Sequence, residues 1–287
     1  MSKQKISSRH HFIPRFLLKE WKDDAGDLWV YQRNGGGEIS YRKGAPKSVA
    51  YVDGLYTLFP EHRLSKPASD EIEKEVMAKL DDRAAIIHKV IIDQGVNAIS
   101  EEDRYIWAVF IASMIERTPH RLKEYKDRAN IEDLIRELNE AYPGADQLVD
   151  KFGFDVKALV NNTTLKFMVD RILSHDLALD IAKMEWIVVR INSPGEHFVL
   201  GDRALVVNNA PDVEEPLYFI RLAIAPDRLM LLAFDSSIVD HDFISALTMT
   251  YNVTVMERSE RYVISSRELV NGSHTKFDRI IREMHRV

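Results

Sequence analysis

The chain of 287 residues contains no cysteine. It therefore has no disulfide, no metal site with cysteine ligands and no thiol nucleophile, and the absence is consistent with a reducing compartment. Long apolar runs are also missing. The longest, from Trp107 to Ile115 and interrupted by Ser113, is far shorter than the roughly 20 residues of a membrane-spanning helix. The polar amino terminus lacks the apolar segment of a secretory signal, so we expect a cytoplasmic protein with no membrane partner.

The sequence motifs of the common cofactor and metal sites are missing as well. We find no glycine-rich phosphate loop, no dinucleotide fingerprint, no nucleophile elbow and no His-Glu-x-x-His zinc motif. The adjacent His10 and His11 have the wrong spacing for two ligands on one helix face. A magnesium site built from Asp81, Asp202 and a glutamate has no supporting pattern. We therefore expect no cofactor and no metal.

The charge is nearly balanced, with 39 lysines and arginines against 45 acidic residues and a net charge of −6. This mild acidity argues against a surface that binds polyanions everywhere, although a local basic groove is compatible with it. Hydrophobic residues make up 45% of the chain, which is enough to build a core and excludes a disordered or fibrous protein. Because no linker is poor in apolar residues, we expect a single domain over residues 1–287, with residues 267–287 as a helical extension.

Hydropathy patterns predict a β-hairpin near the amino terminus and helices in the middle of the chain. Residues 27–33 and 38–42 have strand character, and the turn signal Asn34–Gly37 joins them. The middle of the chain has apolar residues at helical spacing. Helices are expected at about residues 69–95, from Ser100 to the break at Thr118-Pro119, and at about 121–141 and 163–182.

β-Branched segments return in the last third of the chain. Strands are expected at about residues 186–191, 197–200, 217–223, 230–234 and 262–265, with a helix from Ser236 or Ser237 to about Tyr251 and another at 275–286. The predicted fold is therefore α+β: an N-terminal β-hairpin region, a central helical bundle and a C-terminal antiparallel sheet with helices. The basic face of the last helix could contact nucleic acid, but a docked terminal helix has the same pattern.

The run from His10 to Leu18 holds the first candidate site residues. His11 and Arg15 lie four positions apart beside the rigid Pro14, among bulky apolar groups, and both are costly to bury unless an anion meets them. One interpretation is an acid–base histidine beside an arginine that holds a carboxylate or phosphate. The alternative is a surface arm whose apolar residues pack on the core while His11 and Arg15 reach solvent.

Three further charged residues are candidates. Arg117 ends an apolar helix, where it is either a favourable C-terminal cation or an anion-binding group carried into a pocket. Asp202 follows a hydrophobic strand and a glycine, a place where catalytic carboxylates and plain turns both occur. Asp81 belongs to the first long helix, on which most acidic residues are expected to form the solvated face.

These segments together resemble a known family. The run His11-Phe12-Ile13-Pro14-Arg15-Phe16, the Arg117-Thr118-Pro119 motif and the segment Phe198 to Asp202 resemble the bacterial family catalogued as domain of unknown function (DUF) 4238. That family opens with a Gln-His-Tyr-Val-Pro-like phrase, has Arg-Thr-Pro after its central helix and Ser-Asp-x-Pro after a late strand. The resemblance spans about residues 10–266, and its first two motifs are the more specific ones.

The resemblance implies a set of site residues but brings no activity with it. Its polar positions fall on His11, Arg15, Arg117 and Asp202, which we assign as candidate catalytic residues. Candidate binding residues are His10, Asp81 and Arg203, with Asp81 at the place of an expected glutamate. Gly201 replaces the family serine and Ala204 its proline, so the geometry around Asp202 is expected to differ.

Two functions are compatible with such a set. The first is metal-independent cleavage of a phosphodiester, most plausibly RNA, in which His11 and Asp202 exchange protons and the arginines stabilise charge on phosphorus. Such an enzyme would suit a bacterial toxin or phage-defence effector with a protein partner from the same system. The second is a non-catalytic module that binds a phosphorylated ligand, a nucleotide or a protein partner. A plainer interpretation is a buried ion-pair network that fixes the amino-terminal arm to the core.

Overall fold

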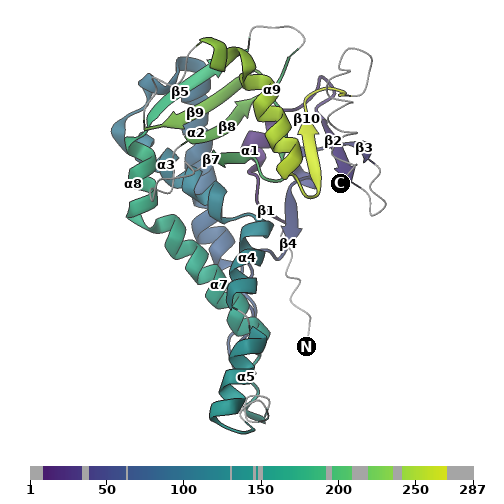
Figure 1. Cartoon of the computed structure of the whole chain (residues 1–287), viewed down its shortest axis with the longest axis vertical. Coiled ribbons are helices and arrows are strands. Elements are labelled where there is room, and N and C mark those ends of the chain that lie inside the picture. Colours follow the sequence, from purple (N-terminus) through teal and green to yellow (C-terminus); the bar gives the residue numbers. More distant parts are fainter. Residues whose placement is uncertain are drawn as a thin grey trace.

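The computed structural model describes residues 9–33, 39–62, 64–129, 131–144, 147, 151–191, 196–208, 219–234 and 241–269. Strands gather at one end of the molecule, and helices α4 (Pro119–Ala129), α5 (Ile131–Ala141) and α7 (Val156–Leu173) extend from it as an arm (Figure 1). The predicted α+β class is confirmed. The hairpin turn at 34–37 and the terminal helix expected at 275–286 lie outside the described residues.

The strands near the amino terminus form two antiparallel pairs, and one of these pairs also binds strands from the end of the chain. Strand β1 (Arg9–His11) pairs antiparallel with β4 (Tyr51–Asp53), and the short helix α1 (Arg15–Lys19) follows β1. The predicted hairpin is present as β2 (Leu28–Arg33) and β3 (Ile39–Gly44). A second sheet has the order β3-β2-β10-β6, because the late strands β10 (Tyr262–Ser265) and β6 (Leu200–Gly201) add to the hairpin.

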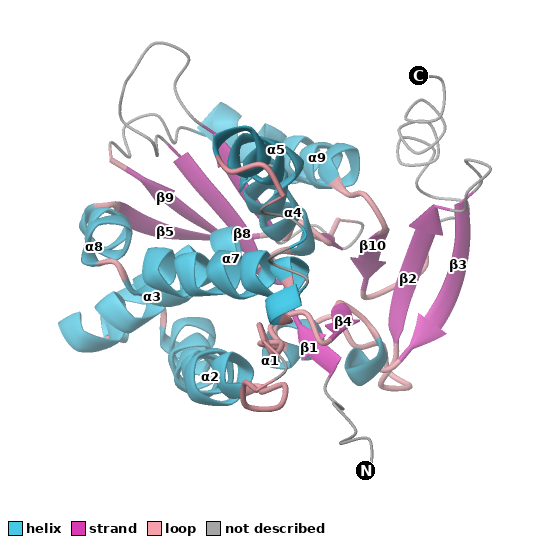
Figure 2. Ribbon diagram, turned by 90° about the horizontal axis from the view of Figure 1, so that it is seen from below, coloured by secondary structure: helices cyan, strands magenta, loops and turns pink. Residues whose placement is uncertain are grey.

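The carboxy-terminal sheet forms the centre of the fold. Its antiparallel order is β5-β9-β8-β7, from strands β5 (Glu185–Arg190), β7 (Leu205–Asn208), β8 (Phe219–Ala225) and β9 (Arg228–Ala233). Helix α9 (His241–Arg258) lies between this sheet and the β3-β2-β10 sheet (Figure 2). All of β8 is buried.

Helix boundaries follow local capping. Helix α3 (Glu101–Glu116) begins as predicted at Ser100, whose side chain accepts the Asp103 amide, and α2 (Ala78–Gln94) ends at Gly95, whose φ is +89°. A π-helical segment at Ile72–Met77 precedes α2.

Several predictions for the later segments are wrong in detail. Helix α9 continues to Arg258, beyond the expected end at about Tyr251, and its expected start at Ser236 or Ser237 lies outside the described residues. The helix expected at 163–182 is two helices, α7 and α8 (His175–Lys183), because Ser174 between them is extended. The strand expected at 197–200 is reduced to β6. The Phe198 and Val199 amides instead donate to the Pro226 carbonyl and the Asn252 side chain, so they form no ladder.

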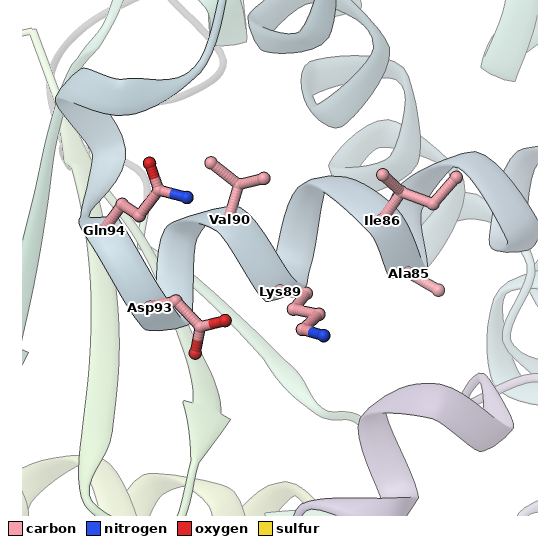
Figure 3. A pocket seen from close by; sticks show the side chains of 6 residues that line it. All are labelled: Ala85, Ile86, Lys89, Val90, Asp93 and Gln94. Carbon is pink, nitrogen blue, oxygen red and sulfur yellow. The ribbon is translucent and has the colours of Figure 1, made fainter.

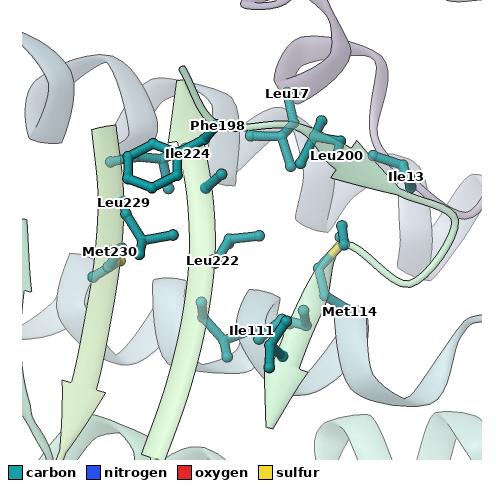
Figure 4. Close-up of a cluster of buried hydrophobic side chains, with 14 of the residues drawn as sticks. Ile13, Leu17, Ile111, Met114, Phe198, Leu200, Leu222, Ile224, Leu229 and Met230 are labelled. Carbon is teal, nitrogen blue, oxygen red and sulfur yellow. The ribbon is translucent and has the colours of Figure 1, made fainter. Parts of the chain in front are cut away.

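One large core connects the sheets with α1, α2 and α3. Figure 4 shows Leu17 of α1, Ile111 of α3 and Leu222 of β8 converging in it, together with Phe198 and Leu229. Burial of such aliphatic and aromatic side chains is the main stabilising contribution to the fold. The core therefore fixes the carboxyl end of α3, next to Arg117, against the sheet.

Candidate functional site

The amino-terminal motif is anchored inside the protein by His10. Its ring is fully buried, stacks on the Tyr56 ring at 5.4 Å, and accepts the Tyr56 backbone amide at Nδ1 over 2.8 Å. Nε2 lies 3.5 Å from an Asp70 carboxylate oxygen. Burial lowers the pKa of His10, against the opposing effect of the Asp70 and Asp53 carboxylates. His10 is therefore a hydrogen-bonding link between β1 and the segment that contains Tyr56.

His11 occupies the other side of β1. It packs against the Tyr51 ring at 5.7 Å, and its Nε2 is buried without a hydrogen-bond partner. Burial and the positive charge of Arg15 lower its pKa. Arg15 itself is exposed at the start of α1. The structure thus brings His11 and Arg15 near one another. Among the described residues, the groups that contact His11 or influence its charge are Tyr51, Arg9, Arg15 and Pro46, and neither Arg117 nor Asp202 is one of them.

Arg117 is completely buried at the end of α3. Its Nη1 donates to Asp81 over 2.7 Å, and its Nη2 lies 2.9 Å from the Met114 sulfur, while Nε has no partner. The Arg117 carbonyl accepts the Tyr56 hydroxyl over 2.8 Å. Since Tyr56 also bonds to His10, one tyrosine connects the first two sequence motifs. Two of the predicted site residues, Asp81 and Arg117, thus form an ion pair between α2 and α3.

A second carboxylate, Glu73, belongs to the same cluster. Burial, reinforced by the Asp81 charge, raises its pKa to about 7, and its Oε2 is buried without a partner. Burial also raises the pKa of Asp81, against the attraction of Arg117. Glu73 lies in the π-helical segment, a type of irregularity that is frequent at functional sites. Two carboxylates therefore face one guanidinium.

The contacts of Asp202 match the turn interpretation, one of the two that the sequence left open. Its carboxylate accepts the Glu260 amide at 3.0 and 3.1 Å and the Arg261 amide at 2.6 Å, so it caps the turn between α9 and β10. Burial raises its pKa. Backbone amides occupy both oxygens, and the structure does not bring Asp202 together with His11 or Arg117. The turn interpretation therefore describes this residue better than the catalytic one.

A cavity of about 650 Å³ lies beside Arg117, where α3, α4, α7, α8, α9 and β7 meet. Glu116 and Thr118, on either side of Arg117, line it, as does Arg203, which follows Asp202. The second and third sequence motifs thus each lead into its wall. Of the predicted site residues, Arg203 alone is among those that line the cavity.

Arg203 belongs to a chain of charged groups on one wall of the cavity. Its Nη2 pairs with Glu260, and the same carboxylate lies 2.6 Å from Nδ1 of His120. Nε2 of His120 lies 3.1 Å from Glu124, which also accepts Arg121 at 2.9 Å. The imidazole is therefore held between two carboxylates, with a guanidinium on either side.

Glu116 organises the opposite end of this wall. It is fully buried, lies 3.3 Å from Arg171 and 3.7 Å from Arg121, and accepts the Tyr125 hydroxyl. Burial, together with Glu116, raises the pKa of Tyr125. Tyr125 in turn accepts Arg121 Nε over 3.0 Å. One buried carboxylate thus fixes two guanidiniums at the cavity.

Sequence reasoning missed most of these residues. His120 and Arg121 directly follow the Arg-Thr-Pro motif, and His120 and Glu124 lie four positions apart on one helix, so a local signal for them existed. Glu116, Tyr56 and Glu73 had no such signal, because only the fold brings them to their arginines.

Two other hollows lack such convergence. One of about 350 Å³ lies along the outer face of α2, and Figure 3 shows its side chains, among them Ile86, Lys89 and Asp93, all from that single helix. Another, of about 440 Å³, adjoins His62 and Asp155. Neither contains a group of arginines.

Within the described residues, no group of three or more His, Asp or Glu side chains is placed to hold a metal ion. No described helix is long and apolar enough to cross a membrane. No curated protein and no solved structure matches the chain. A family model described as "Protein of unknown function (DUF4238)" matches residues 9–268. Because this match covers nearly the whole chain, the chain belongs to the DUF4238 family.

Proposed function

We propose that the protein binds a phosphate-bearing ligand in the cavity beside Arg117. The observation that carries the proposal is the convergence of cationic side chains in a hollow of about 650 Å³, a size typical of small-molecule sites. These side chains are Arg121, Arg171, Arg203 and Arg258, and the imidazole of His120 lies among them. A guanidinium suits this task because its planar fork donates paired hydrogen bonds to phosphate oxygens.

The acidic partners orient these cations without using all of their donors. Arg121 and Arg171 share the single buried Glu116. Arg203 has a buried Nε without a partner, and Arg258 donates one hydrogen bond to the Val207 carbonyl over 3.1 Å. A site whose cations are already held in place loses less conformational entropy when an anion binds.

The first test measures binding to phosphate compounds by thermal shift and calorimetry. We expect inorganic phosphate and nucleoside monophosphates to stabilise the protein in a concentration-dependent way, by about 2.7 kcal/mol at one hundred times Kd. Arg203→Gln should weaken binding at least tenfold. The control is Arg190→Gln, which removes an exposed arginine of β5 that pairs with Asp227. Equal binding by wild type and both variants would refute the proposal.

A second candidate function is cleavage of a phosphodiester at the same cavity. The specific observation that favours it is the His120 ring, which lies between Glu260 and Glu124 beside Arg203. A histidine in this position can exchange protons with a substrate, and nearby arginines can stabilise charge on phosphorus. The set of His11, Arg15, Arg117 and Asp202 supports cleavage less well, because Arg117 has no exposed surface.

The test for cleavage uses RNA in the presence of EDTA. We expect His120→Gln to abolish product formation, whereas His11→Ala, at a distance from the cavity wall, should retain it. Such cleavage would suit a bacterial toxin or phage-defence effector with a protein partner. If RNA stays intact with wild-type protein, binding without catalysis is the better proposal. If wild type cleaves and His120→Gln cleaves equally well, catalysis by His120 at this cavity is refuted.

A further inference from the structure

The cavity has three walls of different chemistry. The first carries the arginines and His120 described above. The second is formed by Asp176 and Asp180, which lie one turn apart on α8. The third is apolar and consists of Met114, Ile115, Leu177, Leu205 and Val207. A ligand that carried phosphate alone would use only the first wall.

Asp176 and Asp180 differ from the other carboxylates of the cavity. Glu116 and Glu124 each accept from an arginine, whereas Asp180 has only Lys183 at 3.8 Å and Asp176 has no ion pair among the described residues. Asp176 is exposed and the Asp180 side chain is 46% exposed, so neither carboxylate is taken up by the protein. Because an ionised carboxylate is an acceptor only, both are available to hydrogen-bond donors of a ligand. The neighbouring hydroxyls of a ribose provide two such donors at close spacing.

The apolar wall indicates the third part of the ligand. Leu177 lies between the two aspartates in the sequence, and Leu205 and Val207 project from β7, which follows Arg203. Apolar side chains in a ligand cavity contact the flat or hydrocarbon part of the ligand, while a few polar groups fix its orientation. A nucleobase has such a face and would stay near the ribose.

We infer that the cavity accommodates a ribonucleoside monophosphate, with its phosphate at the arginine wall, its ribose hydroxyls at Asp176 and Asp180 and its base at the apolar wall. The inference rests on the proposed phosphate-binding function. It adds that the protein distinguishes a ribonucleotide from both free phosphate and a nucleotide that lacks the sugar hydroxyls.

The experiment measures, by calorimetry on the full chain, the binding of adenosine 5′-monophosphate, its 2′,3′-dideoxy analogue, inorganic phosphate and phosphoethanolamine. We expect wild type to bind the ribonucleotide at least tenfold more tightly than the dideoxy analogue. The double variant Asp176→Asn, Asp180→Asn should lose this difference and keep its affinity for inorganic phosphate. The control is Asp93→Asn on the outer face of α2, which should behave like wild type.

The outcomes separate this inference from the function on which it rests. If no phosphate compound binds to wild type, the proposed function fails. If phosphate and both nucleotides bind equally well, or if phosphoethanolamine binds best, phosphate recognition stands and the ribonucleotide inference is refuted. Since Asp176 lies in the first turn of α8, the melting temperature of the double variant shows whether a loss of binding reflects unfolding.

Discussion

Removal of the Arg117 side chain should destabilise the fold far more than removal of another arginine that joins the same two helices. Arg117 is fully buried and pairs with Asp81 over 2.7 Å, whereas Arg83 is about half exposed and pairs with Asp103 over 3.2 Å. Both ion pairs connect α2 with α3. The comparison of Arg117→Ala with Arg83→Ala therefore isolates the effect of burial.

The magnitude follows from the charges left behind. Loss of one partner from a buried ion pair costs about 3–5 kcal/mol, because the other charge remains without compensation. Asp81 keeps 22% of its side chain exposed, which favours the lower end of this range. At roughly 2–4 °C per kcal/mol, Arg117→Ala should lower Tm by about 6–12 °C. Arg83→Ala should cost less than about 1 kcal/mol, as exposed pairs do.

The assay is urea denaturation followed by circular dichroism, with Tm as a second measure. A second variant, Arg117→Met combined with Asp81→Leu, tests the cause, because replacement of both charges by apolar groups removes the uncompensated carboxylate. It should be more stable than Arg117→Met alone. Equal losses for Arg117→Ala and Arg83→Ala, or a double variant no better than the single one, would refute the reasoning.

Three further predictions concern Glu73, Asp202 and Gly201. Since the folded-state pKa of Glu73 is raised from its ordinary 4.5 to about 7, its burial should lower stability progressively as pH rises from 4.5 to 7. A fully buried carboxyl with this pKa shift would lose about 3 kcal/mol of folding free energy, and partial exposure reduces the loss to roughly 1–2 kcal/mol. Urea denaturation of Glu73→Gln at several pH values between 4.5 and 7 should show no such decrease in stability. Asp202→Ala should cost about 1–3 kcal/mol in urea denaturation, because it leaves two turn amides without an acceptor; a loss equal to that of an exposed aspartate would contradict the capping role. Gly201→Ser should lower Tm, because a Cβ there would lie 2.1 Å from Ser259 Oγ and 2.9 Å from Val255 Cγ1. The additional change Ser259→Gly should recover part of the loss if the clash with Ser259 causes it.

The sequence predicted the elements whose signals are local. Ser100 and Gly95 mark helix ends through capping and positive φ, and the hairpin follows from alternating residues around a turn signal. The break between α7 and α8 was not predicted, because the apolar residues on either side of Ser174 continue at helical spacing. The strand expected at 197–200 failed because Asn252, far along the chain, takes one of its amides.

The candidate site shows the same division between local and distant signals. The resemblance grouped Arg117 and Asp81 with His11, Arg15 and Asp202, and of these the structure pairs Arg117 with Asp81. The burial of Arg117 depends on Tyr56 and on packing that no single segment encodes. Asp202 followed a pattern shared by turns and catalytic sites, and only its contacts with the Glu260 and Arg261 amides distinguish them. Residues that line the cavity come from five helices and one strand, so spacing within one segment could not reveal their proximity.

The pairing of β2 with β10 determines how late in translation this sheet can be completed. Tyr31 pairs with Val263, more than 200 positions later. The edge of β2 that does not face β3 therefore has no partner until the ribosome has synthesised the chain beyond residue 263. At 5–20 residues per second, that interval lasts roughly 10–50 s. During it the nascent hairpin exposes an unpaired edge, which is a template for misassociation between growing chains. Translation speed and chaperone access should therefore influence how much of this protein reaches its native state.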